Sequence, residues 1–144
     1  MVPLPYPKPT SAEVTRRMRR NGRRDTKPEV ALRAELHARG ERFRKDLPVR
    51  AAERVVRPDV VFTRARVAVF VDGCFWHCCP IHGNQPKKNT SYWGPKLERN
   101  LARDSAVNEA LSQSGWLVVR GWEHERPDVI ADRVVAALDW ARRR

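Results

Sequence analysis

The chain has 144 residues, of which 29 are Lys or Arg and 17 are Asp or Glu, giving a formal net charge of +12. This length suits one domain with a buried core, and apolar runs of at most five residues exclude a predicted membrane span. The charge excess predicts a nucleic-acid partner, the alternative being a solvated basic surface, in a cytoplasmic, nucleoid-associated protein.

The first segment, residues 1–10, holds four prolines and is predicted to be a flexible arm ahead of a domain spanning 11–144. From Ser11 the pattern becomes helical, with Val14 and Met18 one turn apart. This basic segment would lie along a DNA backbone with Met18 toward the bases, or else Met18 packs on the core. The arginines around it are Arg16, Arg17, Arg19, Arg20, Arg23 and Arg24.

A helix is predicted over residues 27–39, where Leu32 and Leu36 form an apolar stripe and Gly40 provides a stop. Thr26-Lys27-Pro28-Glu29 fits a capping box at its start. The Glu29 carboxylate therefore has two interpretations, one closing the box on Thr26 and one serving a catalytic site.

Two apolar runs, Val55–Phe62 and Arg66–Val71, predict a β-hairpin in the middle of a sheet, with Thr63-Arg64-Ala65 as its turn. Residues 42–49 are a candidate short strand. Asp59 interrupts the first run directly after Pro58. A carboxylate inside a strand is costly to desolvate and needs a partner, a cation or a cleft. We therefore expect a functional role, the alternative being a strand-edge or turn aspartate.

The second half begins with a long irregular segment, residues 73–92, which we expect a metal to hold. A helix over about 95–114 carries an inward stripe of Leu97, Leu101, Asp104, Asn108 and Leu111. Asp104 on that stripe indicates either a nearby catalytic centre or a salt bridge to a buried arginine. A strand over 116–122 and a helix from Pro127 to the C-terminus complete an α/β fold, a central mixed sheet flanked by helices.

Soft metal ligands gather after the hairpin, where Cys74, Cys79 and His82 have zinc-site spacing and His124 follows the last strand. Cys78 competes with Cys79. Four protein ligands would close the site, so we expect zinc to be structural and to stabilise this loop.

Hard ligands lie beside them. Asp59 and Asp72, with the Val71 carbonyl, are oxygen ligands suited to Mg²⁺, as a DNA phosphodiesterase requires. His77, just past the strand end, has a side chain suited to a general base. The adjacent rings of Phe75 and Trp76 would wedge between base pairs, or else fill the core.

Several motifs carry a family resemblance. Arg57-Pro58-Asp59, the run Val69-Phe70-Val71-Asp72-Gly73-Cys74-Phe75-Trp76-His77, Tyr92-Trp93, Arg99-Asn100, Arg103-Asp104, Gly115-Trp116 and Trp122-Glu123 occur in this order. Together they resemble the very short patch repair (Vsr) endonucleases, a branch of the restriction-endonuclease-like fold. The resemblance spans about residues 18–140.

The resemblance implies an endonuclease that nicks 5′ of the thymine at T·G mismatches left by deamination of 5-methylcytosine. It implies Asp59 as the central magnesium ligand, helped by the Val71 carbonyl, and His77 as the general base or its close partner. Glu29 and Asp104 would support water and metal. It also implies a wedge at the mismatch, formed by Met18, Phe75 and Trp76, in a monomer cooperating with MutL and a repair polymerase.

Two departures from the family pattern stand out. Val71 and Asp72 occupy positions where family members can carry threonine and histidine, so Asp72 is a candidate extra metal ligand. The zinc loop is one residue shorter than the histidine-rich version. Two rival functions remain, a nuclease of the same fold with a restriction or defence target, and a zinc-stabilised DNA-binding module without catalysis.

Overall fold

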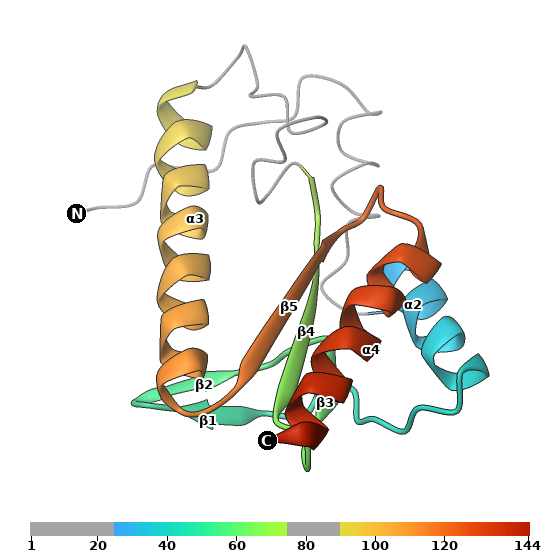
Figure 1. Ribbon diagram of the computed structural model, residues 1–144. Helices are drawn as coiled ribbons and strands as arrows, with labels where there is room; N and C mark the ends of the chain where they lie inside the picture. Colours follow the sequence, from blue (N-terminus) through green and yellow to red (C-terminus); the bar gives the residue numbers. More distant parts are fainter. Residues whose placement is uncertain (1–24, 75–89) are drawn as a thin grey trace.

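The computed structural model describes residues 25–74 and 90–144 (Figure 1). Its helices and strands form the α/β fold that the sequence predicts, with four consecutive strands between the first two described helices. In chain order the elements are α2 (Lys27–Ala38), β1 (Val49–Ala51), β2 (Arg54–Val56), β3 (Val60–Phe62), β4 (Val67–Asp72), α3 (Thr90–Gln113), β5 (Leu117–Trp122) and α4 (Pro127–Arg143). None of the described helices is long and apolar enough to cross a membrane.

The central sheet is mixed, as predicted, with the order β3-β4-β5. β3 and β4 form the expected antiparallel hairpin, and β4 pairs with β5 in parallel, which places Asp72 opposite Trp122. β1 and β2 form a separate two-stranded sheet. β4 is thus the central strand, and its C-terminal end lies beside that of β5.

The predicted first strand of the hairpin is wrong in extent, because residues 57–59 separate β2 from β3. The physical reason is Pro58, which has no N–H to give to a ladder. β3 also lies at the edge of its sheet, where Arg44 forms an isolated bridge with Val61. Residues 42–49, predicted as a candidate short strand, contain only this bridge and the first residue of β1, Val49.

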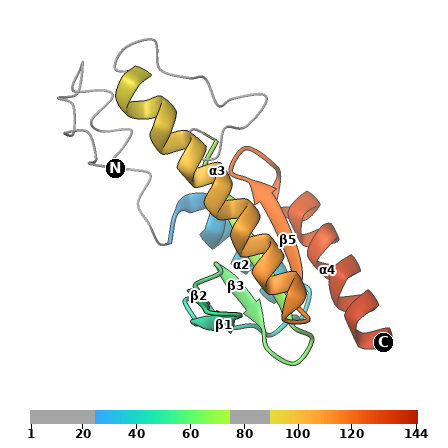
Figure 2. The same cartoon turned by 90° about the vertical axis from the view of Figure 1, so that its left-hand side faces the viewer.

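Helices cover both faces of the sheet (Figures 1 and 2). Alternate residues of β4 point to opposite faces, so Val67 and Val69 pack with Leu32 and Leu138 of α2 and α4. Ala68, between them, packs on the other side in a cluster that includes residues of α3, β1 and β2. Figure 2 shows α3 crossing that second face.

The helix predictions hold with two changes. Thr26 caps α2, accepting a hydrogen bond from the Glu29 N–H (3.5 Å), and Gly40 follows with a positive φ of 82°. α3 begins at Thr90 and continues through Pro95, earlier than predicted. Leu101 is 43% exposed, so it does not belong to the inward stripe as predicted, whereas Leu97 and Leu111 are buried.

Candidate active site

Asp59 lies between Pro58 and the first residue of β3, and its backbone and side chain both bind β4. Its N–H donates to the Val69 carbonyl (2.9 Å), and its Oδ2 accepts the Val71 N–H (2.7 Å). β4 continues past the point where β3 begins, so the carboxylate occupies the place that a further strand residue would have. These two bonds fix the carboxylate at the C-terminal end of the central strand.

A second acid meets Asp59 from α2. Glu29 is 7% exposed and shares a side-chain hydrogen bond with Asp59. Among the described residues, Arg33 forms an ion pair with Glu29, with its Nη1 3.7 Å from Glu29 Oε2. Of the two interpretations of Glu29, the capping bond to Thr26 uses only its backbone, and its carboxylate faces Asp59.

The pKa of Asp59 is raised from 3.8 to about 7, chiefly because burial penalises the ionised form. The Val71 N–H opposes this, while the negative charges of Glu29 and Asp72 add to it. A cation near Asp59 would relieve both the burial penalty and the repulsion. Oxygen ligands with excess negative charge fit a hard divalent ion such as Mg²⁺, so the predicted donor set is chemically suited to that metal.

Asp72 ends β4 and is 7% exposed. Both its carboxylate oxygens lie within hydrogen-bond distance of Arg120 Nη1, at 2.9 and 3.1 Å. Arg120 also reaches α3, where its Nε donates to Asn108 Oδ1 (2.8 Å) and its Nη1 lies 3.9 Å from Asp104 Oδ1. One of the two explanations predicted for the inward-facing Asp104 was a salt bridge to a buried arginine, and Arg120 is an arginine in that position.

Two of the four predicted zinc ligands come together at the paired ends of β4 and β5. Cys74 is 4% exposed, and its Sγ lies 3.2 Å from His124 Nδ1. The Cys74 N–H donates to Glu123 Oε1 (3.2 Å). A thiolate and an imidazole are ligands that zinc prefers. Within the described ranges, no three His, Cys, Asp or Glu side chains gather around one point as a metal site requires.

The other predicted site residues lie outside the described residues. They are the proposed base His77, the zinc candidates Cys78, Cys79 and His82, the wedge residues Met18, Phe75 and Trp76, and the basic residues Arg16, Arg17, Arg19 and Arg20.

Two residues with clear roles here were missed by the sequence reasoning. Arg120 is the only charged residue of β5, and a charge inside an apolar strand is the same signal that singled out Asp59. Glu123 follows that strand directly, and its carboxylate fixes the backbone of Cys74. Neither partner could be found from spacing, because β4 and β5 are far apart in the sequence.

Known proteins resemble this chain over most of its length. The sequence model of a family described as "DNA mismatch endonuclease Vsr" matches residues 8–82. The Type II nicking enzyme V.NaeI of Lentzea aerocolonigenes is 52% identical over 135 residues, covering 93% of this chain and 80% of that protein. V.XorIIP of Xanthomonas oryzae pv. oryzae, also a Type II nicking enzyme, is 44% identical over 111 residues, covering 74% and 76%. The DNA mismatch endonuclease Vsr of Escherichia coli K12 is 34% identical over 111 residues, covering 76% and 68%.

Proposed function

The chain belongs to the Vsr family of DNA endonucleases, and from this premise we propose that it nicks duplex DNA at T·G mismatches. The cut falls 5′ of a thymine produced by deamination of 5-methylcytosine, and it requires magnesium. The observation that carries this proposal is the buried Asp59 carboxyl, fixed on β4 beside Glu29 with its pKa raised to about 7.

Asp59 and the Val71 carbonyl are the groups that would hold Mg²⁺. When bound, the cation supplies positive charge that stabilises the phosphorane-like transition state and lowers the pKa of coordinated water. The Val71 N–H fixes the direction of the Asp59 carboxylate (2.7 Å). Glu29 orients a water molecule next to Asp59, and Asp104 on α3 helps to position that water and the metal. His77 accepts the proton of the attacking water, for which the ordinary imidazole pKa near 6.5 is suitable.

Zinc holds the segment that follows β4, bound by Cys74, Cys79, His82 and His124. The approach of Cys74 Sγ to His124 Nδ1 (3.2 Å) supports this assignment. The fixed segment then presents Phe75 and Trp76, which with Met18 unstack the mismatched pair. Arg16, Arg17, Arg19 and Arg20 neutralise phosphates, in keeping with the net charge of +12.

A second candidate function is a nick at another DNA target in a restriction or defence setting. The similarity to V.NaeI and V.XorIIP, which are named Type II nicking enzymes, favours it. Both candidates use the same Asp59 chemistry and differ in the DNA that is recognised. A cytoplasmic monomer that cooperates with MutL and a repair polymerase belongs to the first candidate only.

The test is a nicking assay on duplexes that differ only in one T·G pair. Wild-type protein with Mg²⁺ is expected to cut the mismatched duplex, in the thymine strand alone. Equal cutting of the matched duplex would favour the second candidate, and binding without any cutting would favour a DNA-binding module. Asp59→Asn should bind the mismatched duplex with wild-type affinity and leave it intact.

A further inference from the structure

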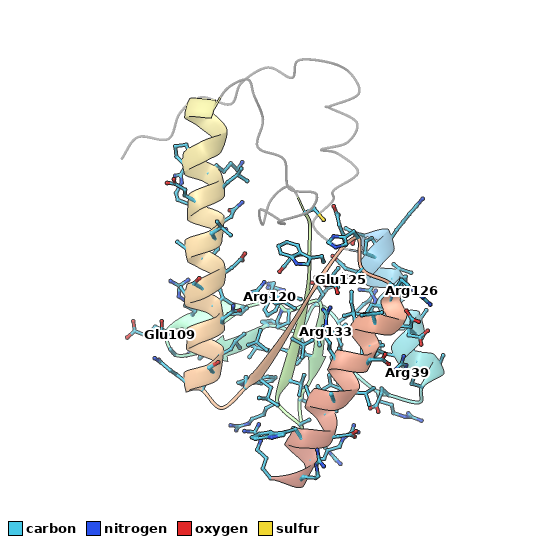
Figure 3. The ribbon with its side chains drawn as sticks, turned by 45° about the horizontal axis from the view of Figure 1, so that its top comes forward. Arg39, Glu109, Arg120, Glu125, Arg126 and Arg133 are labelled. Carbon is cyan, nitrogen blue, oxygen red and sulfur yellow. The ribbon has the colours of Figure 1, made fainter. Side chains whose placement is uncertain are left out.

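Arg120 of β5 contacts residues of both β4 and α3. Its guanidinium binds Asp72 (2.9 and 3.1 Å) and Asn108 (2.8 Å), and its Cζ lies 4.3 Å from the centre of the Phe70 ring. Figure 3 shows Arg120 reaching from β5 into the space between the sheet and α3. The planar fork can make these contacts at once, which a lysine ammonium cannot.

The register of the sheet explains why Asp72 and Arg120 meet. Phe70 is the parallel partner of Arg120, and Asp72 lies two residues further along β4, on the same face. Asp72 is 7% exposed, and a buried carboxylate without a cation would be strongly unfavourable. Arg120 supplies that cation, so the electrostatic requirement of Asp72 is met by the protein itself.

Asp59 is in the opposite situation. Its carboxylate accepts a hydrogen bond from the Val71 N–H and faces another acid, Glu29, and no arginine or lysine in the described part of the chain pairs with it. Of the two strand-end aspartates, only Asp59 therefore has uncompensated charge for an added cation. A metal drawn to Asp72 would also have to approach the guanidinium, at a Coulombic cost.

Arg120 further extends this arrangement to α3. Its Nη1 lies 3.9 Å from Asp104 Oδ1, one helical turn from Asn108, which accepts the Nε–H. Asp104 thus lies within ion-pair distance of Arg120, which also binds Asp72 at the end of β4.

We propose that Arg120 is a positioning residue for the nicking reaction. It anchors Asp72, which is a charge partner and not a magnesium ligand, and it holds Asp104 of α3 beside the end of β4. This inference rests on the proposed function, because Asp104 acts in the reaction proposed above. It assigns a role to the Asp72–Arg120 pair at a position where family members can carry a histidine.

The kinetic test compares Arg120→Met, Arg120→Lys and Asp72→Asn with Arg142→Met, a matched control that breaks the exposed ion pair with Glu41 (2.9 Å). On the T·G duplex, Arg120→Met should lower kcat at least tenfold with KM within twofold of wild type. Arg120→Lys should recover part of that loss. Adding Asp72→Asn to Arg120→Met should cause no further loss of kcat, because the carboxylate that has lost its arginine partner is itself removed. This double variant also controls for misfolding of the single variant.

The magnesium dependence separates an anchor from a ligand. Asp72→Asn should leave the half-saturating Mg²⁺ concentration within twofold of wild type. A tenfold increase would identify Asp72 as a ligand and overturn the proposal, as would a kcat for Arg120→Met equal to that of the Arg142→Met control.

Hydrogen–deuterium exchange provides a readout that needs neither DNA nor metal. Amides of residues 100–108 should exchange at least tenfold faster in Arg120→Met than in wild type, with no change in Arg142→Met. Unchanged exchange would overturn the anchoring of α3. If wild-type protein nicks no T·G duplex, the proposed function fails by itself, and the exchange comparison still decides whether Arg120 positions Asp104.

Discussion

Replacing Asp59 with asparagine is expected to stabilise the metal-free protein while it abolishes nicking. The carboxylate is buried beside Glu29, with Asp72 also contributing negative charge, and the Val71 N–H opposes these effects only in part. Asparagine keeps an oxygen acceptor for that N–H, and its amide donates to Glu29. The substitution therefore removes a destabilising charge and conserves the local hydrogen bonds.

The size of the effect follows from the pKa of Asp59, which rises from 3.8 to about 7. At about 1.4 kcal/mol per pKa unit, ionised Asp59 lowers the unfolding free energy by on the order of 4 kcal/mol above pH 7. The folded protein holds a proton between pH 3.8 and 7 that the unfolded chain has lost, so wild-type stability falls as the pH rises through this window. The asparagine variant lacks this dependence.

The measurement is urea denaturation of both proteins in EDTA at pH 8 and pH 4. At pH 8 the variant should be more stable by at least 1 kcal/mol. At pH 4 the difference should be much smaller, because Asp59 is then neutral in the folded wild type and only about half ionised in the unfolded chain. Mg²⁺ should stabilise the wild type and leave the variant unchanged. A variant that is less stable at pH 8, or that gains equally at both pH values, would refute this account of Asp59.

Three further predictions concern residues around the site. Cys74→Ser should release zinc and lower the melting temperature, and an unchanged zinc content by elemental analysis would refute the ligand assignment. Gly121→Ala should cost about 1–3 kcal/mol of unfolding free energy in urea denaturation, because its Cβ would come 2.6 Å from Ile130 Cδ1. Glu125→Gln should destabilise the protein by about 1 kcal/mol at pH 7, since hydrogen bonding by Arg133 lowers the pKa of Glu125. That difference should shrink as the pH falls below 4.5; a constant difference in denaturation curves would contradict it.

The sequence predicted the elements of this fold well because their signals are local. The cap at Thr26, the hairpin turn after β3 and the helix opened by Pro127 each depend on neighbouring residues. The exposure of Leu101 could not be found in this way. Figure 1 shows β5 diverging from α3 after the turn that joins them, so the length of α3 is not covered evenly by that strand.

The sequence predicted which residues belong to the candidate site, but not which of them contact one another. Asp59 was identified because burying a carboxylate in an apolar strand carries a large desolvation cost. Its proximity to Glu29 could not be predicted, because that depends on how α2 packs against the sheet. Asp72 was predicted as a further oxygen ligand after the next strand and has a different environment, because Arg120 becomes its neighbour only through the parallel pairing of β4 with β5. Desolvation can be anticipated from sequence, whereas the compensating partner depends on tertiary structure.

The two hydrogen bonds between Asp59 and β4 restrict how DNA can approach the candidate active site. A side chain that completes the backbone ladder has little rotamer freedom left, because another rotamer would break its hydrogen bond with the partly buried Val71 N–H. The Asp59 carboxylate is therefore held in one position and cannot move to follow the DNA. Under the proposed function, the DNA must bring its scissile phosphate to that point, so the ease with which a DNA site deforms would contribute to how it is selected.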